Sequence, residues 1–148
     1  MSNREIISLV LGFGAFSFIL LLLFYALTAL SYQKIFKAYG YAHPGYAWIP
    51  FYRLYILADL TCGPVFKFGE FEIEKKVFLW WWVIAYIVAF VPFVGNFLSL
   101  IINVVCLGFC HHEGIKKVDP TYDSAVLSYI SAIFGFVLWF LVLPKKVD

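Results

Sequence analysis

The fold is decided by residues 6–30, IISLVLGFGAFSFILLLLFYALTAL, a stretch that contains no charged side chain. As a helix rising 1.5 Å per residue, this stretch is about 37 Å long, enough to cross the ~30 Å hydrocarbon core of a bilayer with some tilt. It is also longer than the apolar core of a signal peptide, which has roughly 7–15 residues. We therefore expect a first transmembrane helix that is not cleaved.

The composition of the whole chain agrees with a membrane location. Of its 148 residues, 64% are hydrophobic and 14% are charged, whereas a soluble domain carries about 25% charged residues. This composition excludes a soluble enzyme and a disordered tail. The formal net charge of +2 is too small to favour a nucleic-acid partner. We predict a single integral membrane domain over residues 1–148, surrounded by membrane lipids.

Three further spans follow from the other uncharged runs. Residues 77–109 contain no charged side chain, and as one helix they would measure about 50 Å, too long for a single crossing. Pro92, Gly95 and Asn96 fall in the middle of this run and are typical of a turn. We therefore expect a helical hairpin within an all-α membrane protein that has about four transmembrane helices, at residues 6–30, 77–91, 93–110 and 125–143.

Aromatic and basic residues dominate the segment between the first two predicted spans. Nine of the 24 residues from 32 to 55 are aromatic, and Tyr and Trp rings favour the headgroup level of a membrane. Pro50 can open a helix over residues 50–60, which is too short to span and should be interfacial or re-entrant. The segment is either a simple connection or a docking surface for lipid phosphates and acidic partner residues, formed by Lys34, Lys37, Trp48 and Arg53.

The distribution of basic residues predicts the orientation in the cell membrane, because cytoplasmic loops carry an excess of Lys and Arg. With four spans, eight basic residues fall on one side and three on the other. This difference predicts that residues 31–76 and 111–124 are cytoplasmic and that both chain termini lie outside.

Two groups of acidic residues have both a functional and a structural interpretation. Asp59 is either a proton or cation site or the partner of Arg53, of a nearby lysine or of a helix terminus. Glu70, Glu72 and Glu74 alternate with apolar residues, which indicates a short extended stretch. Their carboxylates form either an acid–base or metal site or, as we expect, part of a solvated loop that faces neighbouring lysines.

The second arm of the predicted helical hairpin carries a polar stripe. Asn96, Ser99, Asn103 and Cys106 recur at spacings of three, four and three residues, which places them on one side of a helix. Asn exposed to lipid is costly, so this side should face protein or water. The stripe either lines a pathway or holds the helices together through interhelical hydrogen bonds, and we favour the hydrogen bonds.

No catalytic, cofactor-binding or metal-binding residue is predicted. Cys106, Cys110, His111, His112 and Glu113 include good zinc ligands, but adjacent histidines on a helix point in different directions. We interpret them as membrane-buried thiols followed by polar residues at the interface. The chain has three cysteines and no C-x-x-C motif, so neither a disulfide framework nor a redox motif follows.

Four motifs resemble those of a known family. The chain contains YQKIFKA at residues 32–38, PGYAWIPFY at 44–52, WWW at 80–82 and VPFVGN at 91–96. In this order they resemble a family of small bacterial multispanning membrane proteins known only as a domain of unknown function, with the motifs P-G-W-A-x-I-I-P-x-Y-N and I-P-x-V-N. Arg53 stands where the family has Asn. The resemblance covers nearly the whole chain and implies a multispanning architecture and a bacterial membrane, without an activity that can be carried over.

These features favour a protein that makes contacts over one that catalyses a reaction. Aromatic and small-residue surfaces are conspicuous, and no nucleophile–base pair or metal set is complete, so we do not expect an enzyme. We predict a scaffold or auxiliary subunit of a larger membrane complex, in contact with another integral membrane protein or with a second copy of itself. The alternative is a small oligomeric channel or transporter that uses Asn96, Ser99 and Asn103, although a pore should show polar residues on more than one span.

Overall fold

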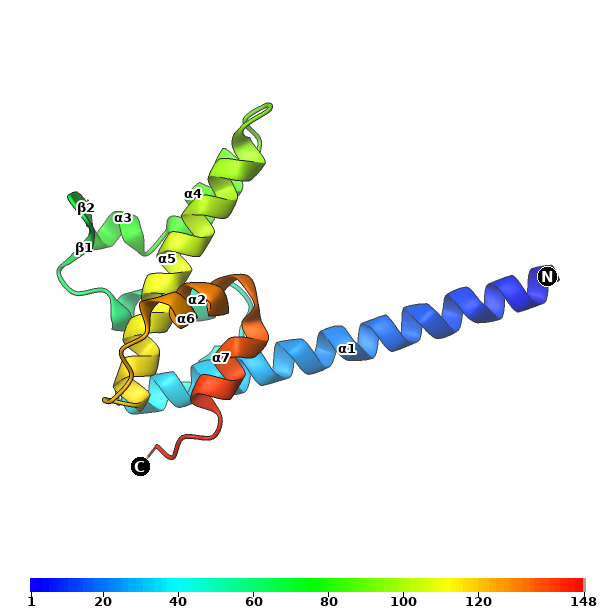
Figure 1. The fold of residues 1–148 in the computed structure, drawn as a ribbon, viewed down its shortest axis with the longest axis horizontal. Coiled ribbons are helices and arrows are strands. Elements are labelled where there is room, and N and C mark those ends of the chain that lie inside the picture. Colours follow the sequence, from blue (N-terminus) through cyan, green and yellow to red (C-terminus); the bar gives the residue numbers. More distant parts are fainter. Residues whose placement is uncertain (148) are drawn as a thin grey trace.

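A computed structural model describes residues 1–147, and within them the chain is almost entirely helical (Figure 1). These residues form seven α-helices, one short 3-10 helix and one two-stranded hairpin. The helical class expected from the sequence is therefore confirmed, with the small β-hairpin as an addition.

Helix α1 (Asn3–Ala38) begins at a capping box. The Ser2 side chain accepts a hydrogen bond from the Glu5 N–H, and the Glu5 carboxylate accepts one from the Ser2 N–H at 2.6 Å, so amides of the first turn are satisfied. The helix contains the predicted span at 6–30 and continues to Ala38 because its last turns pack inside the protein. It ends before Gly40, whose φ of +72° is a conformation that stops a helix.

The two halves of α1 have different surroundings. From residue 3 to residue 24 every side chain is exposed except that of Ser17, which is half-buried. Figure 1 shows this half projecting alone from the rest of the protein. The second half packs against other elements and buries Ala29, Ser31, Tyr32, Ile35 and Phe36. An exposed apolar surface as large as that of the first half marks a contact with a membrane or another protein.

The segment after α1 contains the predicted short helix. A 3-10 helix, η1 (Pro44–Trp48), packs against α1, and α2 (Tyr52–Thr61) follows it. The short helix predicted at residues 50–60 is therefore confirmed. It starts two residues after Pro50 because Phe51, with a φ of +62°, turns the chain immediately before it. The buried side of α2 consists of Ile56, Leu57, Ala58 and Thr61.

The acidic segment forms a β-hairpin. Strand β1 (Val65–Phe68) pairs antiparallel with β2 (Phe71–Glu74). Lys67 lies opposite Glu72 in this register, and their Nζ and Oε1 atoms are 3.2 Å apart on exposed side chains. The expectation of a short extended, solvated stretch is confirmed, and of its three carboxylates Glu72 forms an ion pair with a lysine.

The predicted helical hairpin is present, but its first arm is short. Helices α3 (Lys75–Phe78) and α4 (Trp81–Val88) lead into a turn, from which α5 (Gly95–Val118) returns. The eight residues of α4 amount to about 12 Å, so this arm does not make the separate span predicted at 77–91. The turn is tight because a Cβ on Gly95 would collide with the last carbonyl groups of the first arm.

The fourth predicted span, at residues 125–143, is not a single helix. The chain breaks at Phe134 into α6 (Ala125–Ile133) and α7 (Gly135–Val142), because Phe134 adopts an extended conformation with φ −113° and ψ 95°. The nine and eight residues of these helices amount to about 14 and 12 Å, too short for either to cross a bilayer. Figure 1 shows the two helices meeting at a corner.

The C-terminal segment returns to α1 as a result. Lys34 Nζ donates hydrogen bonds to the backbone carbonyls of Leu143 and Lys145, and Lys145 Nζ lies 3.0 Å from a carboxylate oxygen of Asp119. Lys34 and Asp119 belong to the two segments that the charge distribution placed across the membrane from the C-terminus. The prediction that the C-terminus lies across the membrane from these segments is therefore wrong. It depended on a single crossing helix at residues 125–143, which the break at Phe134 prevents.

Within the described chain two helices, α1 and α5, are long and apolar enough to cross a membrane. Four transmembrane helices are therefore not supported, whereas membrane association is. Figure 1 shows α1 and α5 diverging from the end of the molecule where their C-terminal ends meet. We call this end the base, and it comprises the last turns of α1 and α5 and residues 143–147.

Gly108 allows α6 to approach α5 closely. A Cβ at this position would overlap the ring of Tyr129, so the ring or the helix would have to move. We predict that Gly108→Ala lowers the free energy of unfolding by about 1–3 kcal/mol, the usual cost of overpacking, as measured by denaturation in detergent. The control is Gly12→Ala on the unpacked half of α1, where nothing lies within 4 Å. It should cause no loss, since Ala favours a helix over Gly, and equal losses would contradict the close packing.

Spin labels test the return of the chain end to α1. Lys37 and Lys146 line the same pocket at the base, and the native cysteines are buried, so cysteines introduced at these two positions can be labelled selectively. The distance between the labels, measured by electron–electron resonance, should be well below the ~30 Å thickness of a hydrocarbon core. A distance of about 30 Å or more would instead support the transmembrane span predicted at residues 125–143.

The pH dependence of the distance between the same two spin labels is a second test. A hydrogen bond from the Thr121 side chain and the nearby Lys145 amine hold the pKa of the Asp119 carboxyl below its usual value. The ion pair therefore stabilises the folded chain above the unfolded-state pKa of about 3.9, and this contribution is lost as the pH falls through the lower pKa of the folded state. The distance distribution should be constant between neutral pH and about pH 5 and should broaden only well below the unfolded-state value.

Candidate functional site

Three helices meet at a buried chain of polar side chains. The hydroxyl of Tyr32 on α1 lies 2.9 Å from Nε2 of His111 on α5, and His111 Nδ1 lies 2.8 Å from Oγ of Ser131 on α6. All three residues are at most 3% exposed. We call Tyr32, His111 and Ser131 the buried polar chain.

The hydrogen bonds of this chain fix its proton positions. The Ser131 hydroxyl donates to the carbonyl of Ser128 at 2.6 Å, so its oxygen accepts from the N–H at Nδ1 of His111. The Nε2 atom then carries no proton and accepts from the Tyr32 hydroxyl. A neutral histidine thus satisfies both of its nitrogens, and each buried hydroxyl has a partner.

This arrangement is suited to structure rather than to chemistry. A histidine that activates a serine must accept the serine proton, whereas His111 donates to Ser131 at the nitrogen that faces it. Both side chains are also closed off from the surface. The buried polar chain therefore joins α1, α5 and α6 without presenting a nucleophile to a substrate.

A second polar cluster lies beside the first and fixes the connection between α5 and α6. His112 Nδ1 is 3.1 Å from Oγ of Ser128, and the Tyr122 hydroxyl is 2.8 Å from the same oxygen. The Tyr122 hydroxyl also donates to the carbonyl of Ser124 at 2.6 Å. These contacts anchor the connection to both helices.

Arg53 is withdrawn from the docking surface expected from the sequence. Its guanidinium lies over the rings of Tyr25 and Tyr32, at 4.6 and 5.4 Å from their centroids. Its Nη1 atom is buried and has no hydrogen-bond partner in the described chain. The aromatic rings of α1 thus hold this cation by cation–π attraction, which leaves it poorly placed to bind a lipid phosphate.

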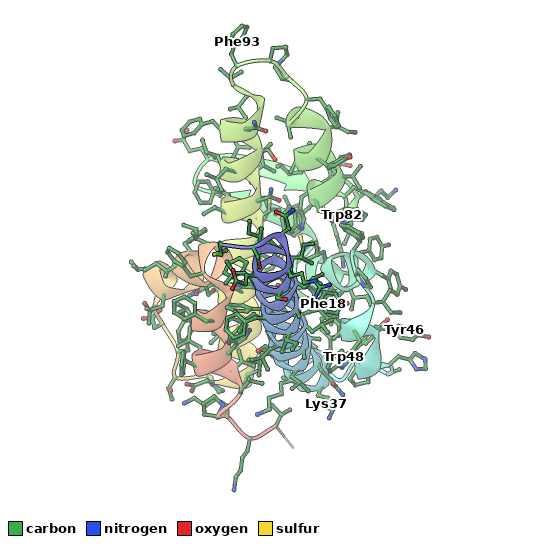
Figure 2. The ribbon with its side chains drawn as sticks, turned by 90° about the vertical axis from the view of Figure 1, so that its right-hand side faces the viewer. Phe18, Lys37, Tyr46, Trp48, Trp82 and Phe93 are labelled. Carbon is green, nitrogen blue, oxygen red and sulfur yellow. The ribbon has the colours of Figure 1, made fainter. Side chains whose placement is uncertain are left out.

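Of the other three residues of that expected surface, Lys34 and Lys37 lie at the base and Trp48 lies on η1 beside α1. The exposed Trp48 donates a hydrogen bond from Nε1 to Gln33 at 3.2 Å, and its carbonyl accepts one from Tyr25. Lys34 is half-buried under the C-terminal segment, and Lys37 is exposed. Figure 2 shows Lys37 and Trp48 at the same end of the molecule, far from the hairpin tip at Phe93.

The polar stripe on α5 is divided between different surroundings. Ser99 and Asn103 line a groove of about 580 Å³ with residues that include Leu54 of α2, Trp82 of α4 and Phe51, which precedes α2. Cys106 instead lines a separate, wholly apolar groove of about 390 Å³ under the β-hairpin. Asn96 is exposed near the hairpin tip. The structure does not bring the four residues of the stripe into one site.

The remaining candidate groups have structural surroundings. Asp59 pairs with Lys75 at 3.0 Å, so the interpretation of this acid as the partner of a nearby lysine is confirmed. Cys62, Cys106 and Cys110 are buried free thiols. Within residues 1–147, no group of three or more His, Cys, Asp or Glu side chains is arranged to hold a metal ion.

Sequence reasoning missed the buried polar chain. From the sequence, Tyr32 is one of several aromatics expected at the membrane interface, and His111 is a poorly placed metal ligand. The one available signal was a histidine inside a continuous helix, at a position where a charge would be costly and a partner is needed. Which hydroxyls supply that partner depends on the packing of helices that are distant in sequence.

Comparisons with protein-family models, with curated proteins and with solved structures found no match to this chain. The resemblance to the family of small bacterial membrane proteins therefore stays a prediction. The functional interpretation depends on the geometry described above.

The hydroxyl of Tyr32 is the donor whose loss should be measurable. Tyr32→Phe removes the hydrogen bond and leaves Nε2 of His111 buried without a partner, so the free energy of unfolding should fall by about 1–3 kcal/mol. The matched control is Tyr86→Phe, since Tyr86 is exposed and makes no side-chain hydrogen bond within residues 1–147. Equal effects of the two changes on thermal unfolding would contradict the assigned role of the chain.

Proposed function

We propose that this protein is an integral membrane scaffold or auxiliary subunit, which holds a larger membrane complex together through its apolar surfaces. The observation that carries the proposal is the unpacked half of α1. None of the most apolar 18-residue window of α1 is buried inside the protein. Residues 6–24 supply about 28 Å of helix, most of a tilted crossing of the ~30 Å hydrocarbon core that ends at Leu30. Such a helix presents its whole circumference to lipid and to neighbouring membrane proteins.

The helical hairpin supports a second contact with the membrane. Trp82 stands at the start of the hairpin, and Phe93 at its tip is fully exposed (Figure 2). Phe93 follows Trp82 by eleven positions, which would measure about 16 Å as helix, roughly half the depth of the hydrocarbon core. An apolar tip avoids water, so we propose that the hairpin re-enters the membrane from the side of the base and ends near its midplane.

The distribution of basic residues supports a cytoplasmic base. Lysines gather at the base, whereas Arg4 is the basic residue at the far end of α1. By the positive-inside rule, the base and the C-terminal segment lie in the cytoplasm and the start of α1 lies outside. This orientation keeps the expected cytoplasmic side for residues 31–76 and 111–124 and moves the C-terminal segment to that side.

A channel is less well supported. A pore needs polar side chains on more than one crossing element, and the polar side chains within residues 6–24 are Ser8 and Ser17 alone. Ser99 and Asn103 face a groove lined mostly by aromatic and aliphatic residues. The alternative of an oligomeric channel through this stripe is therefore kept as an outcome of the test.

Photo-crosslinking in the native membrane tests the scaffold. A benzophenone amino acid replaces Phe16 or Phe18, which are 60% and 62% exposed on the unpacked half of α1, and Phe36, which is 0% exposed, serves as the control. We expect crosslinks to another integral membrane protein from one or both exposed positions and none from the buried one.

Two results would contradict the scaffold. One is a set of products made only of lipid or of multiples of this chain. The other is an ion conductance in reconstituted liposomes that Asn103→Leu abolishes, which would favour the channel.

A further inference from the structure

The base gathers lysines from three separate parts of the chain. Lys34 and Lys37 on α1 line a pocket of about 440 Å³ together with Lys145 and Lys146 of the C-terminal segment. The last turn of α5 adds two more lysines, one of which lies 5.5 Å above the Tyr39 ring at the end of α1. We call these six residues the lysine base: Lys34, Lys37, Lys116, Lys117, Lys145 and Lys146.

Most lysines of the lysine base form no ion pair inside the described part of the chain. Lys34 donates to backbone carbonyls and Lys117 lies over an aromatic ring, and neither partner carries a negative charge. Among the described residues, Asp119 is the carboxylate that forms an ion pair with the lysine base, through Lys145. The other five lysines form no ion pair within residues 1–147.

The lysine base lies where a membrane surface would pass. Lys34 follows Leu30, the end of the apolar run, by four residues or about 6 Å of helix, which is comparable to the thickness of a headgroup layer. The exposed rings of Tyr46 and Trp48 on η1 lie at the same end of the molecule (Figure 2), and such rings favour the headgroup level. Trp48 is tied to Gln33, the neighbour of Lys34, by a hydrogen bond.

We propose that the lysine base binds the phosphate groups of anionic phospholipids in the cytoplasmic leaflet. Opposite charge supplies the attraction, because each lysine near an anionic surface contributes about fivefold to binding. The bordering aromatic rings and the apolar helix favour a lipid surface over an acidic protein, which would need no apolar border. This inference rests on one part of the proposed function, the insertion of the first half of α1 into the membrane, which brings the lysine base to the membrane surface.

The structure makes a sharper assignment than the sequence did. The expected docking surface contained Arg53, which the rings of Tyr25 and Tyr32 withdraw. It omitted the lysines at the end of α5, which are distant in sequence, and the lysines at the chain end, which the predicted crossing segment placed on the opposite side of the membrane. Compared with the expected docking surface, the lysine base lacks Arg53 and contains four additional lysines, Lys116, Lys117, Lys145 and Lys146.

Native mass spectrometry of the full chain in a neutral maltoside detergent tests the proposal. The probes are dioleoylphosphatidylglycerol and dioleoylphosphatidylcholine at equal concentration. The variant is Lys37→Gln, Lys116→Gln and Lys146→Gln, whose amines make no hydrogen bond or ion pair within residues 1–147. The matched control is Lys67→Gln, Lys75→Gln and Lys76→Gln, which removes the same charge from β1 and α3.

The unmodified chain should retain the anionic lipid in preference to the zwitterionic one, and salt should weaken this preference. The base variant should lose at least about tenfold in apparent affinity for the anionic lipid, whereas the control variant should keep most of it. Circular dichroism of both variants establishes that the helices are intact.

Equal retention of the two lipids by the unmodified chain would overturn the proposal, and so would equal losses in both variants. Capture of an acidic protein that depends on the same three lysines, without a lipid preference, would also overturn it. None of these results affects the crosslinks from Phe16 and Phe18, so the lysine base and the scaffold can fail separately.

Discussion

The close contact of α1 with α5 is the interaction on which the rest of the structure depends. Gly114 has no side chain, and the side chain of Ile35 fills the space that a Cβ would need. One turn earlier on each helix, Tyr32 meets His111 through a hydrogen bond. Because the helices touch here, their last turns form the base, and their other ends are free to diverge (Figure 1).

This single junction also explains the division of the apolar surface. The other elements pack only against the second half of α1. The Phe, Leu, Ile and Val side chains of the first half and of the hairpin tip therefore stay exposed. In water such a surface would drive association, and in a bilayer lipid tails cover it without an energetic cost. The exposed apolar surface that favours membrane association is therefore the same surface on which the proposed scaffold function depends.

Local signals predicted several elements well. Pro92 and Gly95 marked the turn between α4 and α5, and the alternation of glutamates with apolar residues marked an extended stretch, which the structure pairs as the second strand of the β-hairpin. In each case the backbone preference of neighbouring residues decides the conformation. The break at Phe134 lacked such a signal, because a single glycine after it is tolerated within a helix. The break depends on the packing of α7 along α1, where Trp139 donates a hydrogen bond to Thr28 at 3.1 Å.

The sequence by itself determined that the chain is helical, that long stretches of it avoid water, and that aromatic and basic residues border those stretches. Hydropathy and helix length are local properties, so they can be read along the chain. The tertiary structure alone decided which polar groups meet. It placed Arg53 over tyrosines, paired His111 with hydroxyls from two other helices, and returned Lys145 to Asp119. A long or buried polar side chain takes the partner that the packing of distant segments brings within about 3 Å, and no local pattern specifies that distance.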